Sequence, residues 1–475
     1  MRVYKPSGIE WLGEIPQSWE IRRLKYLVKR IIGGGTPDTS NLQYWANDEN
    51  EGYLWVSIED ITNADFITDT KRYINQSGLA NSSAKLLPPF SILYSIYASL
   101  GKIAYSNKTL ATNQAILGIQ PNELLFYKFL FYYLQNTTNH IISFSNTTTQ
   151  NNISLFIVAN HKIPLPPLQE QKEIAEFLDS KCEKIQNYID KKQKLITLLQ
   201  EKKQALINEA VCGRVACHTA DSHCHTEPLG EVSNPTCHTE RREVSTMESR
   251  FFANAQNDKG NISYKDSGIE YLGLIPHHWE VVKVKYIATT NIGLVYDPSE
   301  IATNENVGYP VLRANNIQNG KIDYKDVIYV AKKIDDKQLT ISGDLLMCVR
   351  NGSENLLGKT AKIENNNFSF GAFTAIIRSD LNNYLYWIFQ TEMLKKSISS
   401  FIVSIGIGQI SQDDIKNFKI PLPPLHEQKE IAAFLDSKVA QINSAIEKTK
   451  KQIELVKEYK NTLINEAVCG RIRVN

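Results

Sequence analysis

The sequence predicts an α+β chain in which two pseudo-repeated globular units are separated by an antiparallel pair of long coiled-coil helices. Two repeated stretches carry this prediction. "IPLPPLQEQKEIAEFLDSK" at 163–181 returns almost unchanged as "IPLPPLHEQKEIAAFLDSK" at 420–438, and "YKPSGIEWLGEIPQSWE" at 4–20 returns as "YKDSGIEYLGLIPHHWE" at 264–280. A chain of 475 residues is long enough to fill several cores, so each repeat is expected to frame one globular unit.

A long amphipathic helix is predicted after each proline-rich opener. In the first copy Pro167 suits the first turn of a helix, and Glu170 and Glu173 place negative charge at the positive end of the helix dipole. Gly213 is a natural left-handed stop. Apolar residues recur between these signals at heptad spacing. The first seam consists of Leu178, Cys182, Ile185, Ile189, Ile196, Leu199, Leu206 and Ala210, interrupted at Lys192 and Lys203, and the second of Leu435, Val439, Ile442, Ile446, Ile453, Val456, Leu463 and Ala467, interrupted at Thr449 and Lys460.

Each helix would be a rod of roughly 45 residues, on the order of 65 Å long, that needs a partner to be stable. The other copy is the obvious partner, because two like elements in one chain pair about a pseudo-twofold axis, which makes them antiparallel. A plain dimerisation coiled coil is the alternative that an isolated heptad pattern favours. Basic and acidic side chains nearly balance along each rod, which favours spacers and protein-docking faces over helices that bind DNA.

Each globular unit is predicted to be a compact α+β domain. Strand-like runs such as "YLWVSI" and "DLLMCVR" alternate with Gly, Asn and Pro turns, and an apolar helical run follows at 122–135 and at 381–398. The aromatic residues of those runs are expected in the core rather than stacked on bases. The expected organisation is a first unit at 1–166, a helix at 167–214, a low-complexity linker at 215–262, a second unit at 263–423 and a helix at 424–475.

No stretch carries a recognisable catalytic constellation. "GSENLLGKT" at 352–360 resembles a phosphate-binding loop, but five residues separate its glycines where that loop has four. Its counterpart "LGK" at 100–102 has no upstream glycine at that distance, which favours a turn joining two strands. An enzyme with a diverged nuclease or methyltransferase in one half is the alternative, but neither half contains a Gly-rich cofactor loop or clustered carboxylates that the other lacks.

Composition narrows the class of protein. Lys and Arg number 53 against 51 for Asp and Glu, so any basic surface must be local. No apolar run approaches the roughly 20 residues that span a bilayer, and the N-terminus lacks the apolar core of a signal peptide, so a cytoplasmic protein is expected. The 7 cysteines are too scattered for a disulfide framework and are expected to be reduced.

The segment 215–262 differs from the rest of the chain in composition. It contains "CHT" three times and shows no sustained periodicity. A zinc site and a flexible linker are both open, but adjacent Cys-His pairs in place of Cys-x-x-Cys spacing favour the linker, and no metal is expected. The ligands that a zinc site would use are Cys217, His218, Cys224, His225, Cys237 and His238.

Four motifs together resemble the specificity subunits of type I restriction-modification systems: "SGIEWLGEIPQSWE", "GGTP", the opener "IPLPPLxEQKEIAxFLD" and the terminal "INEAVCGR". The resemblance spans both halves, and only the segment 215–262 departs from the family pattern. It implies that each unit is a target recognition domain that reads one half of a split sequence in double-stranded DNA. The helices would hold the two domains apart and dock two DNA methyltransferase (modification) subunits, to which motor-nuclease (restriction) subunits add.

The same resemblance implies a non-catalytic reader with no cofactor of its own, since S-adenosylmethionine and ATP would belong to the partners. Bases are read by side chains whose donors and acceptors sit at loop tips. The candidates in the first unit are Tyr97, Lys102, Asn113, Gln114, Gln150, Asn151 and Asn152, and in the second Arg313, Asn315, Asn316, Arg350, Asn351, Lys359, Gln409 and Ser411. A local hydrogen bond in a turn is the competing explanation for any one of them. A coiled-coil scaffold without DNA contact is a further alternative for the whole chain.

Overall fold

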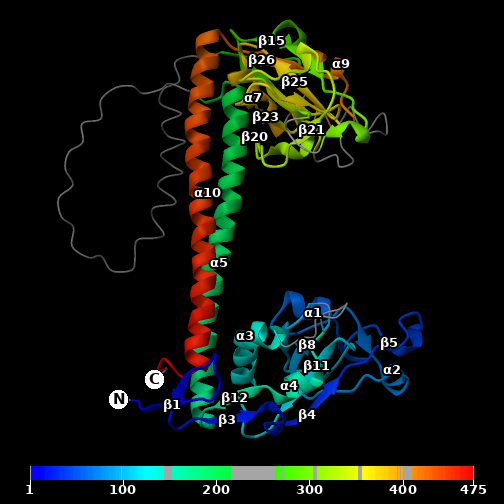
Figure 1. The fold of residues 1–475 in the computed structure, drawn as a ribbon, viewed down its shortest axis with the longest axis vertical. Helices are drawn as coiled ribbons and strands as arrows, with labels where there is room; N and C mark the ends of the chain where they lie inside the picture. Colours follow the sequence, from blue (N-terminus) through cyan, green and yellow to red (C-terminus); the bar gives the residue numbers. More distant parts are fainter. Residues whose placement is uncertain are drawn as a thin grey trace, which may run out of the picture. The chain divides into compact units, whose positions relative to one another are not determined.

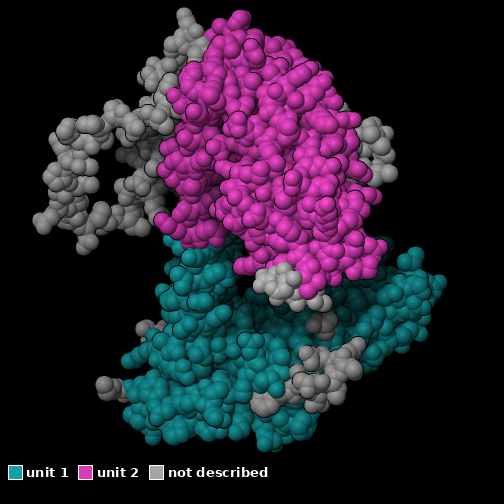
Figure 2. Space-filling view, turned by 45° about the horizontal axis from the view of Figure 1, so that its top comes forward, with its two compact units in different colours: residues 1–194, 449–475 teal, residues 195–448 magenta. Residues whose placement is uncertain are grey.

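The computed structural model describes residues 2–473 with the exception of 98, 144–151, 216–262, 270–271, 303–306, 351–355, 393, 396 and 399–408. The chain forms two compact units (Figure 2): unit 1 is Met1–Lys194 with Thr449–Asn475, and unit 2 is Leu195–Lys448. The two long helices, α5 (Leu168–Val211) and α10 (Leu425–Val468), each contribute residues to both units (Figure 1). The six cysteines and histidines considered for zinc lie outside the described residues.

The described residues of unit 1 form short strands and four helices besides the long pair. Its strands are β1 (Tyr4–Pro6), β2 (Glu14–Pro16), β3 (Glu20–Arg23), β4 (Val28–Gly33), β5 (Trp45–Ala46), β6 (Tyr53–Val56), β7 (Tyr73–Ile74), β8 (Ile92–Ser95), β9 (Ile103–Tyr105), β10 (Leu110–Thr112), β11 (Ile116–Pro121) and β12 (Lys162–Leu165), and its helices besides the long pair are α1 (Ile58–Asn63), α2 (Gln76–Ala80), α3 (Tyr127–Ser143) and α4 (Leu155–Asn160). One sheet has the antiparallel order β4-β11-β8-β9, and another has the order β10-β6-β7-β5 with β10 and β6 parallel. The pairs β1-β2 and β3-β12 are separate antiparallel ribbons.

Unit 2 repeats this plan with different contents. Its strands are β13 (Tyr264–Asp266), β14 (Leu274–Pro276), β15 (Glu280–Lys283), β16 (Thr289–Ile292), β17 (Ile301–Ala302), β18 (Tyr309–Leu312), β19 (Ile317–Gln318), β20 (Lys321–Ile322), β21 (Ile328–Val330), β22 (Leu345–Cys348), β23 (Thr360–Lys362), β24 (Ser369–Phe370), β25 (Thr374–Arg378) and β26 (Lys419–Leu422), with helices α7 (Asn382–Phe389) and α9 (Gln412–Asn417). The central run β16-β25-β22-β23 corresponds to β4-β11-β8-β9 of unit 1, and β20 and β19 extend it. The ribbons β13-β14 and β15-β26 match β1-β2 and β3-β12.

The predicted burial of the aromatic helical runs is confirmed. Phe129 and Tyr133 of α3 are fully buried in a core that also contains Leu178 of α5. In unit 2, Tyr384 of α7 is 2% exposed and shares a core with Leu435 of α10. Each of these cores therefore joins a central sheet to a long helix through aromatic side chains.

The residues of the heptad seams are buried or half-buried along both long helices. In unit 1 the start of α5, at Leu178, shares a core with the end of α10, at Ala467. In unit 2 the end of α5, at Ala210, shares a core with the start of α10, at Leu435. The helices therefore run antiparallel within each unit, and the α+β fold class with two pseudo-repeated units and long coiled-coil helices is confirmed. Among the described residues, no helix has the length and apolar composition needed to cross a bilayer.

The repeated opener makes the same hydrogen bonds in both copies. The indole nitrogen of Trp19 donates to Glu170 Oε2 over 3.0 Å, and that of Trp279 donates to Glu427 Oε2 over 2.9 Å. The fully buried Gln171 donates to a carbonyl of the proline-rich segment, as its counterpart in the second copy also does. A carboxylate acceptor makes the indole bonds stronger than neutral ones. The duplicated stretch is thus a structural frame that ties the first strands of each unit to the start of a long helix.

A hairpin from one repeat and a helix end from the other close each unit. In unit 1 the Tyr4 hydroxyl donates to the carbonyl of Gly470 over 3.1 Å, and in unit 2 Tyr264 donates to Gly213 over the same distance. Both glycines are left-handed, with φ of 73° and 68°. A Cβ at either position would lie 2.7 or 2.5 Å from a proline carbon of the hairpin, so the close approach also requires glycine.

Candidate nucleic-acid interface

The candidate residues of unit 1 that the structure describes meet at one end of its central sheet. The backbone N–H of Ile96, just after β8, donates to the carbonyl of Ala115 over 2.9 Å, and the N–H of Ile153 donates to the carbonyl of Ile96 over 3.1 Å. These bonds bring together the segment after β8, the turn before β11 and the segment before α4. Tyr97, whose side chain is 42% exposed, and the half-buried Asn152 therefore lie close to each other.

Two more polar side chains surround this end of the sheet. Gln114 is exposed in the turn before β11 and accepts a hydrogen bond from the Thr36 hydroxyl. Lys102 is exposed at the start of β9. Burial raises the pKa of nearby Asp65, and the charges of Lys460 and Lys102 oppose that rise. Lys102 therefore lies near a carboxylate, and among the described residues the Gln114 amide nitrogen has no hydrogen-bond partner.

Unit 2 builds the same junction from different side chains. The N–H of Val349 donates to the carbonyl of Phe373 over 2.9 Å, and the N–H of Ile410 donates to the carbonyl of Val349 over 2.8 Å. Arg350 and Gln409 form an antiparallel bridge at the next position, and both are exposed. The guanidinium carbon of Arg350 lies 5.3 Å from the centre of the Phe373 ring.

Register shows that the two junctions are equivalent. Strand β11 pairs with β8 through Ile116 and Ser95, and β25 pairs with β22 through Thr374 and Cys348. The turns after β8 and β22 each contain a left-handed glycine in a "LGK" sequence, as expected for a turn joining two strands. Tyr97 therefore occupies the place of Arg350, and Asn152 that of Gln409. The backbone frame is common, and the side chains presented on it differ.

Three candidates use their side chains to shape loops. Asn113 accepts a hydrogen bond from the backbone of Ala115 in the turn before β11. Asn316 is 1% exposed and accepts from the backbone of Arg313 while donating to two carbonyls. Ser411 caps the N-terminus of α9 by accepting from the backbone of Asp414. Such local bonds are the usual role of Asn and Ser at turns and helix ends.

Three further candidates in unit 2 have partners within the protein. Arg313 pairs with Asp326 Oδ2 over 3.1 Å, and Asn315 donates to the same oxygen over 2.8 Å. The ammonium of Lys359 donates to the carbonyl of Ile317 over 2.8 Å. These groups would have to exchange an internal partner for one on DNA, which reduces the net gain from such a contact.

Gln150, Asn151 and Asn351 lie outside the described residues. Phe373, which is 57% exposed beside Arg350, was not among the residues chosen from the sequence. The signal that could have identified it is its place in the turn before β25, which corresponds to the turn "ATNQA" in the first unit. Within the described ranges, no cluster of three or more His, Cys, Asp or Glu residues could hold a metal ion.

The frame itself presents a second surface in both copies. Tyr26 and Tyr286 occupy the same place in the two repeats and are 63% and 72% exposed. A lysine ammonium lies over each ring, Lys25 at 5.2 Å and Lys285 at 5.1 Å. In unit 1 this surface borders a shallow hollow lined by Arg23 and other basic residues. Because both repeats retain it, the surface suits a partner that is the same at both copies.

Comparison with known proteins assigns both halves of the chain to one family. Residues 16–199 and 276–455 match the family described as "Type I restriction modification DNA specificity domain". The chain is 24% identical over its whole length to the type I restriction enzyme MjaVIII specificity subunit of Methanocaldococcus jannaschii, covering 98% of that protein. It is 30% identical to the EcoKI specificity subunit of Escherichia coli over 42% of this chain and 44% of that one.

Solved structures share the fold. A chain from a structure titled for complex assembly and conformational transition of the type I R-M system superposes with a TM-score of 0.68 at 17% identity, covering 96% of this chain and 99% of that one. The HsdS subunit of Thermoanaerobacter tengcongensis gives a TM-score of 0.52 at 18% identity over 96% and 98% of the two chains. The family model matches two copies of its domain within one chain, and each copy includes one copy of the repeated opener described above. The chain belongs to the specificity subunits of type I restriction-modification systems.

Proposed function

We propose that the chain reads a bipartite, asymmetric sequence in double-stranded DNA, with one target recognition domain at 1–166 and a second at 263–423. One observation carries the proposal: equivalent backbone positions present Tyr97 with Asn152 in unit 1 and Arg350 with Gln409 in unit 2. Because the two units share a backbone frame but present different side chains on it, they should read different half-sites. Arginine pairs with guanine, and Asn or Gln pairs with adenine, through major-groove edges.

The remaining candidate residues supply the surroundings of these positions. Gln114 and Lys102 flank Tyr97 in unit 1. Arg313, Asn315 and Lys359, which each have a hydrogen-bond partner within the protein, lie in unit 2. Asn113, Asn316 and Ser411 hold the loops in shape. The half-site centres are expected about one helical turn apart, roughly 34 Å, as for other twofold readers of the major groove.

The duplicated frame supports docking of other subunits. We infer that the helices at 167–214 and 424–475, with the Tyr26 and Tyr286 surfaces, bind two DNA methyltransferase subunits and, through the assembled complex, motor-nuclease subunits. Tyrosine is enriched at protein interfaces, and the exposed Tyr26 and Tyr286 are therefore suited to contact a partner. The chain acts in the cytoplasm without catalytic activity or a cofactor of its own, and the partners supply the S-adenosylmethionine and ATP chemistry.

An exchange of one unit tests the two-reader proposal. Residues 22–159 are replaced by the matching segment of a relative with a different target, and the chimera is expressed with its methyltransferase. Methylome sequencing of the host should show one half-site changed and the other retained. A palindromic target, or a change in both half-sites at once, would contradict the proposal. As a control, exchanging the matching segment of the second unit should change the other half-site.

A further inference from the structure

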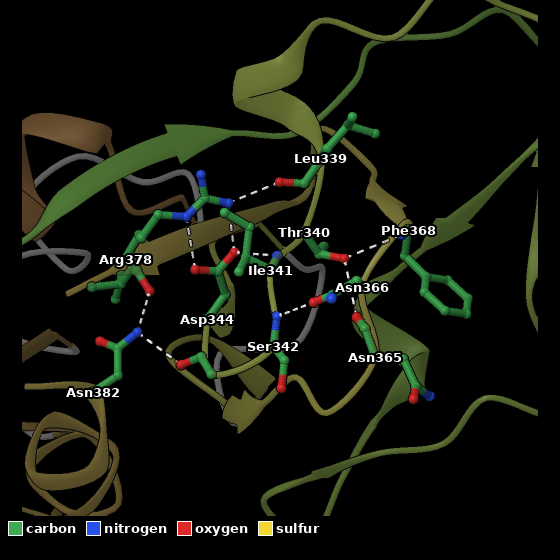
Figure 3. Close-up of polar contacts among 12 residues, drawn as sticks. Leu339, Thr340, Ile341, Ser342, Asp344, Asn365, Asn366, Phe368, Arg378 and Asn382 are labelled. Atoms are coloured by element: carbon green, nitrogen blue, oxygen red, sulfur yellow. Dashed lines mark hydrogen bonds and ion pairs between the residues drawn. The ribbon is translucent and has the colours of Figure 1, made fainter. Parts of the chain in front are cut away.

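Arg350 differs from the other described arginines of unit 2 in the partner of its guanidinium group. The structure describes four arginines in this unit, and three of them form ion pairs: Arg214 with Glu209, Arg313 with Asp326 and Arg378 with Asp344. Figure 3 shows the last pair, in which the guanidinium contacts both oxygens of a buried carboxylate and a backbone carbonyl. Arg350 has no carboxylate partner among the described residues.

Arg350 is instead held by its backbone and by an aromatic ring. Its bridge to Gln409 fixes the main chain on one side, and its N–H lies 3.3 Å from the carbonyl of Phe373 on the other. Its guanidinium carbon lies 5.3 Å from the centre of the Phe373 ring, and that side chain is itself 57% exposed. The negative face of the ring attracts the guanidinium, so the contact holds Arg350 at the surface without a carboxylate.

From this geometry we infer that Arg350 reads a guanine in the half-site of unit 2, and that Phe373 is the positioning residue that orients its guanidinium. The inference rests on the proposed function. Interaction with the ring occupies one face of the planar group and leaves its N–H edge available. That edge matches the O6 and N7 acceptors of guanine in a bidentate contact, and its planar fork fixes a geometry that the flexible lysine ammonium does not. Preorganisation by the ring reduces the conformational entropy lost on binding.

The equivalent positions in unit 1 hold Tyr97 and Ala115, which provide neither the cation nor the aromatic support. A guanine contact by an arginine supported on an aromatic ring is therefore expected from unit 2 and not from these positions of unit 1. An Arg350 that contacted phosphate would lower affinity for every sequence by the same factor when replaced, whereas one that reads a base loses discrimination at one position.

The test uses the full chain assembled with its methyltransferase. Selection from random duplexes with wild type should yield a guanine in the second half-site, and Arg350→Gln should lose roughly 10- to 100-fold of its preference there and nowhere else. Replacing that guanine by 7-deazaguanine, which lacks the N7 acceptor, should weaken wild-type binding but leave Arg350→Gln unaffected. Arg350→Lys keeps the charge and can still donate to guanine, but it loses the planar fork and the support of the ring, so its discrimination should lie between those of wild type and Arg350→Gln.

Phe373 variants separate positioning from structure. Phe373→Tyr keeps an aromatic face and should retain discrimination, whereas Phe373→Leu keeps apolar volume and should lose part of it at the same base pair. A half-site without guanine, or equal loss of affinity for all sequences in Arg350→Gln, would overturn the inference. If the unit exchange still alters one half-site, that result leaves the two-reader proposal standing; if the exchange fails as well, the proposed function falls first.

Discussion

Replacing His161 by phenylalanine should reduce the loss of stability that unit 1 suffers at acidic pH. His161 ends α4, and its ring lies 5.7 Å from that of Tyr133 and 6.3 Å from that of His140. Its Nε2 is buried and has no hydrogen-bond partner in the part of the chain that the structure describes. Burial, followed by repulsion from His140, lowers the pKa of His161 from 6.5 to about 4. The folded protein therefore holds this imidazole neutral where the unfolded chain would protonate it.

The sign and size of the effect follow from proton linkage. Between pH 6.5 and about 4 the unfolded state binds a proton that the folded state does not, so stability is full above this window and falls as the pH falls through it. Going from pH 7 to pH 5, this one group should lower the free energy of unfolding of unit 1 by about 2 kcal/mol. The phenylalanine variant should not lose this amount.

The second repeat provides the matched reference for the substitution. Phe418 ends α9 as His161 ends α4, and its carbonyl accepts from Val284 over 3.0 Å as that of His161 accepts from Leu24 over 2.9 Å. Phe418 is 3% exposed, so the frame accommodates phenylalanine at this place. Introducing it into unit 1 copies an arrangement that the chain already uses.

Hydrogen exchange measures the effect in unit 1 alone. Wild type and His161→Phe are compared at the same pH, so that the intrinsic dependence of exchange on pH cancels, and peptides covering β12 and α4 report the opening free energy. The advantage of the variant should grow by about 2 kcal/mol from pH 7 to pH 5. An equal difference between variant and wild type at the two pH values would refute the reasoning. Peptides of unit 2 serve as the internal control.

Three more outcomes are expected. Asp344→Ala removes the carboxylate partner of the partly buried Arg378 and should destabilise unit 2 by about 3 kcal/mol. The measurement is the urea concentration at which amides of unit 2 lose half of their protection from hydrogen exchange, which should fall. An unchanged midpoint would show that the ion pair does not stabilise the unit. Trp19→Phe removes the indole donor to Glu170 and should lower the free energy of unfolding of unit 1 by about 2 kcal/mol, measured in the same way. The same substitution at the corresponding tryptophan of the other repeat is the control and should destabilise unit 2 instead. Deleting 216–261 should leave assembly and DNA specificity intact, because the repeats resume on either side; joint loss of fold and bound zinc would support the metal site instead.

The repeat and the seams could be predicted because both are written in local sequence. Heptad spacing identifies which face of each helix is buried, and Leu178 and Leu435 are indeed fully buried. The closure of unit 1 by Tyr4 and Gly470 could not be predicted, because nothing local shows that a hairpin packs on the helix end of the other copy. That contact depends on how two distant segments dock, which periodicity does not encode.

The candidate site was predictable as a set of turns but not as a set of available side chains. Arg313 and Arg350 look alike in the sequence, yet one pairs with Asp326 and the other lies over Phe373. Which of these happens depends on loop conformation and on a residue at some distance along the chain. Asn316 shows the same limit, since a buried turn amide and an exposed reader have the same letter. The equivalence of Tyr97 and Arg350 follows from the register of β11 with β8 and of β25 with β22, which appears only in the fold.

Closure by the helix end of the other repeat also sets an order of events during synthesis. Unit 2 is continuous, Leu195–Lys448, whereas unit 1 needs Thr449–Asn475 as well as the first 194 positions. The domain that the ribosome makes first therefore cannot complete its core until residues 449–473 have emerged, after unit 2 has all its parts. At that stage of synthesis the nascent chain would contain all of unit 2, while unit 1 would still lack its C-terminal segment. Premature termination near the end of the chain would therefore damage unit 1 rather than unit 2, although unit 2 lies closer to the truncation in the sequence.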